Sequence, residues 1–427
     1  MQIVAVKKGD SLWGLSQKFG VPVESIVAAN GLVNQNNLVI GQAIIIPTPD
    51  DATHHRVLVG ESLWVIAQRY GVSMQELMEA NNLINPALLF PGQLLTIPQS
   101  AKPVTEVNAY SEKMGETGVR LINEIGEYLT YLSPFSYRAQ RDGSLTELDD
   151  TAIIQAAYNH KAAPMLVVTN FENGTFNPDI ATAVVADQSV QDQLIHNIVA
   201  VMQQKGYRAL NIDFEYVPPA NREDYNNFLR NLVSSLHPHG YLVSTALAPK
   251  ISAEQTGTLY EAHDYQAHGQ IVDFVILMTY EWGWSGGPPR AVAPINEVTK
   301  VLNYALSVIP SEKIMMGMPL YGYDWTLPYV QGGKWAPTVS PQEAVNRAGK
   351  YGATIHYDNI AQSPHYNYYD EQGQEHVVWY EDARSVQAKF DLVKAFKLRG
   401  VSYWVLGVPF PQNWYVLSQN FTIKKLV

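Results

Sequence analysis

The most informative stretch of the sequence reads Ala209-Leu210-Asn211-Ile212-Asp213-Phe214-Glu215-Tyr216-Val217. Apolar residues alternate with Asn211, Asp213 and Glu215, and alternation of this kind is typical of a β-strand. We therefore expect the three polar side chains on one face, with second neighbours roughly 6–7 Å apart. The other face is apolar, as in a strand covered by helices. Pro218-Pro219 ends the strand, which predicts that its polar end lies at the catalytic rim of a barrel. The alternative is a polar strand end whose acids are paired with Arg or Lys.

Strand-like segments alternate with helical segments beyond residue 108, which is the signature of parallel βα units. The spacing predicts an α/β fold, a (β/α)8 TIM barrel, over residues 108–427. Residues 152–158 fit either a further strand or a helix. The segment of about 321–395 is too long for a single connecting loop and predicts a small α+β insertion on the rim. The expected barrel strands are Glu127–Tyr137, Met165–Asn170, Ala209–Tyr216, Leu242–Ala248, Val272–Tyr280, Lys313–Pro319 and Gly400–Leu406.

Composition narrows the classes of function. The chain has 427 residues, enough for two or three domains, and its net charge of −11 without a basic run argues against a nucleic-acid partner. Its 9 Trp and 25 Tyr suit a carbohydrate-facing surface. Because there is no Cys, disulfides and thiolate metal sites are excluded, and His54-His55 is expected to be solvated. No stretch approaches the roughly 20 apolar residues of a membrane span, and the N-terminus lacks the pattern of a cleavable signal peptide.

The first hundred residues contain an internal repeat. Gly9-Asp10-Ser11-Leu12-Trp13 matches Gly60-Glu61-Ser62-Leu63-Trp64, and every further matching pair is separated by the same 51 positions. This self-similarity predicts two copies of one small α+β unit (βααβ), residues 1–48 and 52–99. Trp13 and Trp64 are expected in the core, beside Leu12 and Leu63. Residues 99–106 are expected to form a polar linker to the barrel.

The two units resemble LysM domains, which bind glycans that contain N-acetylglucosamine, such as peptidoglycan and chitin. In the first unit the resemblance implies a sugar groove between Gly9-Asp10-Ser11-Leu12 and the loop Asn30–Leu32. In the second unit it implies a groove between Gly60-Glu61-Ser62-Leu63 and the loop Asn81–Leu83. Two weak sites in tandem are expected to raise the effective concentration of a polymeric ligand.

Four barrel motifs resemble those of family 18 glycoside hydrolases. Asn211-x-Asp213-x-Glu215 is similar to the end of that family's Asp-x-x-Asp-x-Asp-x-Glu motif. Met278-Thr279-Tyr280-Glu281 resembles its Met-x-Tyr-Asp strand, and Gly317-Met318-Pro319-Leu320-Tyr321-Gly322 resembles its Gly-x-Pro-Phe-Tyr-Gly strand. Trp404 falls where the last strand of the family holds a Trp under the scissile sugar. Trp282, in the Gly-rich loop after Glu281, is a candidate to line the sugar groove, with an exposed hinge as the alternative.

The sequence departs from the family motif at two positions that bear on the chemistry. Asn211 stands where the family has an Asp that shares charge with the middle Asp of the motif. Asp213 therefore lacks a like-charged neighbour behind it, and its pKa is expected to be raised less by repulsion. Glu281 stands where the family has Asp, and a ligand contact, a salt bridge and a solvated rim position all remain open for it.

Glycoside hydrolysis requires a proton on the leaving oxygen and a nucleophile at the anomeric carbon. Glu215 has the position and the chemistry of the acid, and an apolar setting would keep it protonated near neutral pH. By the resemblance, the N-acetyl group of the substrate acts as the nucleophile. Asp213 would orient and stabilise the resulting oxazolinium ion, and Tyr280 would hold the acetamido oxygen. The resemblance implies no metal and no organic cofactor.

The combination of LysM units and a family 18 barrel resembles the cortex-fragment-lytic enzymes of endospore-forming bacteria. It implies a peptidoglycan N-acetylglucosaminidase of the spore coat or cortex region, with peptidoglycan or a related N-acetylglucosamine polymer as its partner. Two alternatives stay open. Chitin offers the same acetamido group and would make the protein a chitinase. A catalytically inert, glycan-binding barrel is the alternative from another class.

Overall fold

Eight parallel strands close into a barrel in the computed structural model, which describes residues 1–32, 38–47, 54–98 and 102–427. The strand order is β11-β12-β13-β14-β20-β5-β6-β8, and β8 pairs with β11 to close the ring. The fold therefore confirms the expected TIM barrel. Its strands are β5 (Val104–Ser111), β6 (Tyr131–Pro134), β8 (Ala163–Thr169), β11 (Ala209–Asp213), β12 (Leu242–Leu247), β13 (Phe274–Leu277), β14 (Ile314–Pro319) and β20 (Gly400–Trp404).

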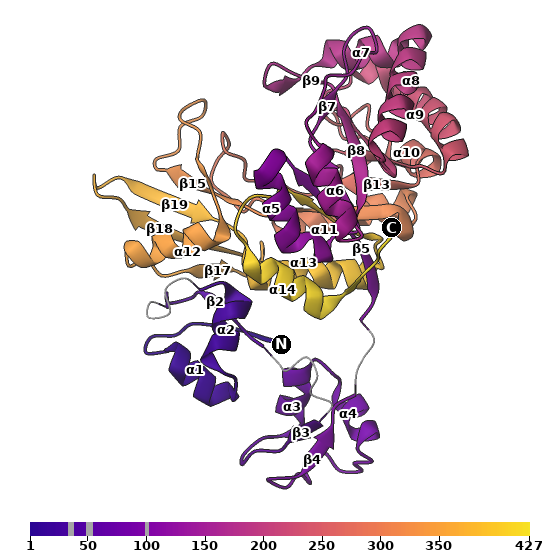
Figure 1. The fold of residues 1–427 in the computed structure, drawn as a ribbon. Helices are drawn as coiled ribbons and strands as arrows, with labels where there is room; N and C mark the ends of the chain where they lie inside the picture. Colours follow the sequence, from indigo (N-terminus) through magenta and orange to yellow (C-terminus); the bar gives the residue numbers. More distant parts are fainter. Residues whose placement is uncertain (33–37, 48–53, 99–101) are drawn as a thin grey trace.

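Helices surround the barrel and bury its outer face (Figure 1). The longest of them begins after Asp187, whose side chain accepts from the backbone of Ser189 and Val190, and ends at Gly206 in the left-handed conformation. The barrel helices are α5 (Gly115–Ile125), α6 (Thr151–Asn159), α7 (Pro178–Ala186), α8 (Gln188–Lys205), α9 (Arg222–Leu236), α10 (Tyr265–Ile271), α11 (Ile295–Val308), α13 (Ala383–Phe396) and α14 (Pro411–Asn420). Short strands accompany them: β7 (Tyr137–Arg138), β9 (Phe171–Glu172), β10 (Thr175–Phe176) and β21 (Thr422–Ile423). Among the described residues, none of the helices has the length and hydropathy needed to cross a membrane.

The first barrel strand, β5, corrects the sequence prediction. Residues 104–106 were expected in a polar linker, but they open β5, while residues 99–101 lie outside the described residues. Glu106 is buried, and its carboxylate pairs with Arg399 at 2.6 Å and with Lys424 at 2.7 Å. Its partners lie about 300 positions away, so a local pattern could not reveal them. Residues 152–158, which fitted either state, are helical in α6.

An antiparallel sheet is inserted after β14, as expected. Its order is β16-β15-β19-β18-β17, and the helix α12 packs against it. Residues 383–395 of the expected insertion belong instead to α13, whose apolar side joins the barrel core. The elements of the insertion are β15 (Gly322–Thr326), β16 (Thr338–Val339), α12 (Pro341–Lys350), β17 (His356–Asp358), β18 (Ser363–Tyr369) and β19 (Glu375–Trp379).

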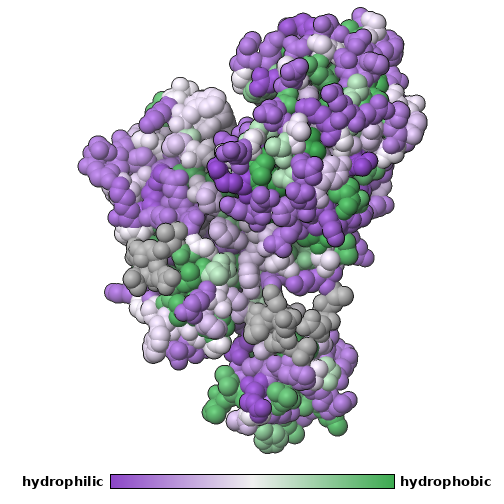
Figure 2. Space-filling model, in the orientation of Figure 1, coloured by the Kyte–Doolittle hydropathy of each residue, from purple (hydrophilic) through white to green (hydrophobic). Residues whose placement is uncertain are grey.

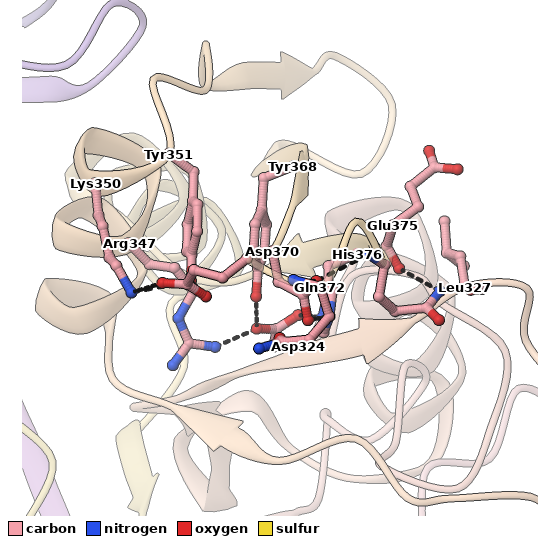
Figure 3. Close-up of polar contacts among 12 residues, drawn as sticks. Asp324, Leu327, Arg347, Lys350, Tyr351, Tyr368, Asp370, Gln372, Glu375 and His376 are labelled. Atoms are coloured by element: carbon pink, nitrogen blue, oxygen red, sulfur yellow. Dashed lines mark hydrogen bonds and ion pairs between the residues drawn. The ribbon is translucent and has the colours of Figure 1, made fainter.

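Asp324 ties the inserted sheet together (Figure 3). Its buried carboxylate accepts from Tyr368 at 2.6 Å and pairs with His376 at 2.9 Å and with Arg347 of α12. Because side chains alternate along β15, Tyr323 and Trp325 point to the opposite side, into an apolar cluster that includes Tyr280 and Trp404. The network thus fixes the strand that carries aromatic side chains toward the barrel mouth.

Each N-terminal unit has the expected order of strand, two helices and strand, with the domain junction at residues 48–53 outside the described residues. Trp13 and Trp64 correct a prediction, because 69% and 60% of these residues are exposed. Adjacent residues on a helix point roughly 100° apart, so buried Leu12 and Leu63 do not carry their neighbours inward. The elements are β1 (Gln2–Ala5), α1 (Leu12–Phe19), α2 (Val23–Asn30) and β2 (Ala43–Ile46), then β3 (His54–Arg56), α3 (Leu63–Tyr70), α4 (Met74–Ala80) and β4 (Leu94–Thr96).

His55 also differs from expectation. It was expected to be solvated, but it is buried on β3, with Nε2 2.7 Å from Glu61 and Nδ1 2.9 Å from the Tyr70 hydroxyl. Arg69 holds the other oxygen of Glu61 at 2.7 Å. The histidine is thus part of a polar network inside the second unit.

Candidate active site

Asp213 ends β11 at the mouth of the barrel, where the sequence predicted a catalytic carboxylate. The residue is buried, and this burial raises the pKa of its carboxyl group to about 7. Desolvation is the cause of this shift, and Asn211, an uncharged amide, adds no like charge on the strand. Among the described residues, Oδ1 of Asp213 has no hydrogen-bond partner. The carboxyl group therefore has an oxygen available to a substrate group.

Glu215 follows two residues beyond Asp213, after the strand has ended. Burial, reinforced by the negative charge of Asp213, raises the pKa of the Glu215 carboxyl well above its ordinary value. This shift favours the protonated form of Glu215, which is the form that a general acid needs. The next residue, Tyr216, has a φ of +55°, so the chain turns sharply behind the acid.

Asn170 fixes the backbone at Glu215. Its Oδ1 accepts from the Glu215 amide at 3.0 Å, and its Nδ2 donates to the Glu215 carbonyl at 2.8 Å. Asn170 comes directly after β8, the neighbour of β11 in the barrel. We did not identify this residue from the sequence, because its role depends on the pairing of two strands that lie 45 positions apart.

Asn211 is fully buried on β11 and is held by side chains of two other strands, of which only β12 pairs with β11. Its Oδ1 accepts from the Tyr110 hydroxyl at 2.9 Å, and its Nδ2 donates to the Ser244 hydroxyl at 3.0 Å. Tyr110 belongs to β5 and Ser244 to β12. Tyr110 escaped the sequence analysis because its strand was not recognised.

Tyr280 lies beyond the end of β13, in the same region as the two acids. Burial and the charges of Asp213, Glu215 and Glu281 raise the pKa of its hydroxyl well above its ordinary value, so it remains a hydrogen-bond donor. The structure thus brings Tyr280 close to Asp213 and Glu215, and Asn211 lies on the same strand as Asp213; their catalytic roles stay predictions.

Glu281 is held by two tyrosines of the inserted segment. The Tyr321 and Tyr323 hydroxyls both donate to its Oε1, the latter at 3.0 Å. Burial nevertheless raises the pKa of the Glu281 carboxyl, against the lowering effect of these two hydrogen bonds. Of the three roles left open for Glu281, the salt bridge is replaced by these tyrosine contacts. Tyr321 stands in a motif already noted in the sequence, whereas no local signal marked Tyr323.

Aromatic residues line the approach to the acids. Trp404 ends β20 and packs edge-on against Phe135 and Tyr110, with ring centroids 4.8 and 5.6 Å apart. Trp282 is half-buried, and together with Tyr280 and Glu281 it lines a pocket of about 340 Å³. Asp213 and Glu215 do not line this pocket, but its aromatic residues, which include Tyr260, offer ring faces that suit a sugar.

The residues predicted to bind sugar in the two N-terminal units serve largely internal roles. Glu61 is bound to His55 and Arg69, and Asn30 and Asn81 each bond a strand backbone across the unit. Leu12 and Leu63 are buried. The remaining predicted residues lie at exposed turns and helix caps: Gly9, Asp10, Ser11, Gly60 and Ser62.

Among the described residues, no group of three or more His, Asp or Glu side chains is placed to hold a metal ion.

Comparison with known proteins agrees with both resemblances. Residues 158–408 match the sequence model described as Glycosyl hydrolases family 18, and residues 4–47 and 55–98 match the LysM domain. The chain is 47% identical to the cortical fragment-lytic enzyme of Bacillus cereus, over 100% of this chain and 99% of that protein.

Solved structures give the same result. The spore cortex-lytic enzyme SleL of Bacillus megaterium QM B1551 is 44% identical with a TM-score of 0.89, covering 100% of this chain and 99% of that one. A chitinase of Chromobacterium violaceum is 27% identical with a TM-score of 0.68, covering 74% of this chain and 98% of that one.

Proposed function

We propose a specific substrate for this chain, which belongs to family 18 of the glycosyl hydrolases and is a glycoside hydrolase with two LysM domains. It hydrolyses N-acetylglucosaminyl bonds in peptidoglycan, in spore cortex or in cortex fragments. The observation that carries the proposal is Glu215, a carboxyl group whose pKa is raised by burial and by the charge of buried Asp213. The 47% identity over the whole chain with a cortical fragment-lytic enzyme supports peptidoglycan as the polymer and the spore as the location.

The catalytic step uses one protein acid. Glu215 gives its proton to the oxygen of the scissile bond, and the C–O bond to the anomeric carbon breaks as the acetamido oxygen of the substrate attacks that carbon. The product of this step is an oxazolinium ion. Glu215, now ionised, takes a proton from water while the water oxygen attacks the anomeric carbon. The bond between the anomeric carbon and the acetamido oxygen breaks, which opens the oxazolinium ring and restores the acetamido group. Two displacements at the same carbon give retention of configuration.

Asp213 and Tyr280 serve the acetamido group in this scheme. The unpartnered Oδ1 of Asp213 accepts from, and orients, the acetamido N–H, and it stabilises the positive charge of the ring that forms. The Tyr280 hydroxyl donates to the acetamido oxygen. Trp404 packs under the sugar, and Glu281 and Trp282 contact it at the pocket wall. Asn211 binds no sugar directly and acts through its bond to Tyr110.

The LysM region holds the glycan near this cleft. Because Leu12, Leu63, Glu61, Asn30 and Asn81 are committed to internal contacts, sugar contacts in this region come mainly from exposed backbone and turn residues. Peptidoglycan is therefore the proposed partner of both the cleft and the LysM region.

Chitin oligomers are the second candidate substrate, favoured by the likeness of the barrel to a chitinase structure at 27% identity. The test compares kcat/KM on soluble cortex fragments and on chitin oligomers of equal length, with products identified by mass spectrometry. We expect N-acetylglucosamine at the new reducing ends from cortex and a lower kcat/KM on chitin. A higher kcat/KM on chitin would identify chitin, and not peptidoglycan, as the substrate. Binding of both polymers without cleavage of either would contradict the assignment as an enzyme.

A further inference from the structure

The first LysM unit is packed against the catalytic domain (Figure 1). Gln412 of α14 donates to Oδ1 of Asn30 at 2.7 Å and to the carbonyl of Ala43 at 2.8 Å. Arg384 of α13 donates to the carbonyl of Gly41 at 3.1 Å, and the Ile355 amide donates to the carbonyl of Ile40 at 2.9 Å. Further contacts come from Gln342 of α12, which donates to the Gly31 carbonyl. Residues 30–31 and 40–43 thus form a docking face that meets α12, α13, α14 and the segment at Ile355.

The same face is exposed in the second LysM unit. The constant separation of 51 positions assigns a counterpart to each residue of the docking face. Val39 is 6% exposed and its counterpart Phe90 is 66% exposed, while Ala43 is 2% exposed and its counterpart Leu94 is 54% exposed. Ile45 is fully buried in one cluster with the barrel helices, and its counterpart Thr96 is exposed.

Apolar surface collects on this open face and beside it. Ile84 and Leu88 stand in the loop before Phe90, and both are exposed. Figure 2 shows apolar surface on the second unit, which projects below the rest of the molecule. The second unit therefore exposes the face that the first unit buries.

The size of the residue at position 31 and at its counterpart, position 82, explains why the second unit cannot dock as the first unit does. A Cβ atom on Gly31 would lie 2.4 Å from Cγ of Pro411, the first residue of α14. The counterpart of Gly31 is Asn82, which has nearly the same backbone conformation, with φ of +57° and +53° respectively. The first unit thus has a glycine where docking demands one, and the second unit has a residue that would collide with α14.

We propose that the two LysM units have different roles: the first is a docking domain fixed to the catalytic domain through residues 30–31 and 40–43, and only the second presents the corresponding face, within residues 81–94, to the glycan. In the first unit, the loop that begins at Asn30 is one of the two walls of the expected sugar groove, and the catalytic domain covers it. The chain therefore captures glycan at one LysM site, and the tandem gain expected from the sequence is absent. The glycan part of this proposal rests on the proposed function.

Reciprocal variants at the paired positions test the docking half without any glycan. Gly31→Asn gives the first unit the residue of the second, and Asn82→Gly does the reverse, with the backbone conformation preserved in both. Hydrogen exchange followed by mass spectrometry on the full chain is expected to speed up about tenfold or more over residues 38–46 in Gly31→Asn. Asn82→Gly should leave that segment unchanged. Unchanged exchange in Gly31→Asn would overturn the docking role. Gln412→Ala is the second variant, should Gly31→Asn fail to fold.

Glycan binding tests the other half on the full chain carrying Glu215→Gln, which removes the proposed acid. The probe is a chitin tetramer or soluble cortex glycan. We expect slower exchange over residues 81–94 and no change over residues 30–43, with both segments protected once Gly31→Asn is added. Protection of residues 30–43 in the chain without Gly31→Asn, or of neither segment, would overturn the division of roles. Hydrolysis by the chain with Glu215 intact, measured separately, reports on the proposed function alone.

Discussion

The side chain of Asn211 accepts a hydrogen bond from the hydroxyl of Tyr110 at 2.9 Å, behind the carboxyl group of Asp213. Ser244 binds the other end of the same amide. The amide is therefore fixed by two hydroxyls and can take no proton from Asp213. The charge of the site consequently rests on Asp213 and Glu215, with no third carboxylate on the strand.

Asn211→Asp should move the basic limb of the pH profile upward. A buried carboxylate beside Asp213 adds like charge, which raises the pKa values of the pair. We expect the basic limb of kcat/KM to shift by about one pH unit or more. The measurement is kcat/KM on cortex fragments from pH 4 to 9. Tyr110→Phe serves as the control, because it removes the hydroxyl without adding charge and should not shift the limb. An unchanged limb in Asn211→Asp would contradict this account of the pair.

Asp213→Asn should stabilise the protein at alkaline pH while abolishing activity. The folded pKa of Asp213, about 7, lies above its unfolded value, so the cost of burying its charge grows as pH rises from about 4 to 7. The variant removes this cost, and we expect its free energy of unfolding to exceed that of the unaltered protein by roughly 2–4 kcal/mol at pH 8. Denaturant unfolding at pH 8 and pH 4 measures the difference. The gain in the free energy of unfolding should vanish at pH 4. An equal gain at pH 4 and pH 8 would contradict a raised pKa of Asp213.

Asn170→Ala should lower kcat more than it raises KM. The variant frees the amide and the carbonyl of Glu215, so the acid loses its position relative to the leaving oxygen. A loss of about 10- to 100-fold in kcat corresponds to roughly 1.4–2.7 kcal/mol of lost positioning. Steady-state kinetics on cortex fragments separate the two constants. Asn231→Ala, which breaks a bond to Gln191 on the outer helices, is the matched control and should leave both unchanged. Equal losses in the two variants would mean a general loss of structure.

Asp324→Asn should loosen the inserted sheet. Arg347 and His376 lose a buried carboxylate, and breaking such a network costs roughly 3 kcal/mol. Thermal unfolding and limited proteolysis between residues 322 and 379 report the change. Glu371→Gln is the control, since its ion pair with Lys350 is largely exposed and should contribute little. The account fails if both variants unfold at the same temperature.

Much of the catalytic domain was predictable because its signals are local. The alternation around Asp213 and the three further motifs predicted the barrel, and the structure confirms it. Tyr280 and Trp404, which two of these motifs contain, pack against the same aromatic cluster. The strand β5 was missed because its residues facing the barrel interior are polar, including Glu106 and Asn108. Those side chains find partners only after the ring has closed, so their pattern resembles that of a loop.

The LysM units show the other limit of sequence reasoning. The repeat and its order of elements were evident, but the pattern within one unit could not show which face another domain would cover. Gly31 and Asn82 look like ordinary loop residues until Pro411 lies beside one of them. The prediction that Trp13 and Trp64 are buried was wrong, because burial of Leu12 and Leu63 does not imply burial of the next residue on a helix.

The most direct test of the central claim uses cortex fragments treated with the protein or with its Glu215→Gln variant. Mass spectrometry then identifies the sugar at each new reducing end. We predict N-acetylglucosamine ends from the protein and a loss of about 100- to 10,000-fold in their rate of appearance with the variant, because general-acid catalysis typically contributes a factor of this size. Equal rates from the two proteins, or N-acetylmuramic acid at the new ends, would contradict the claim.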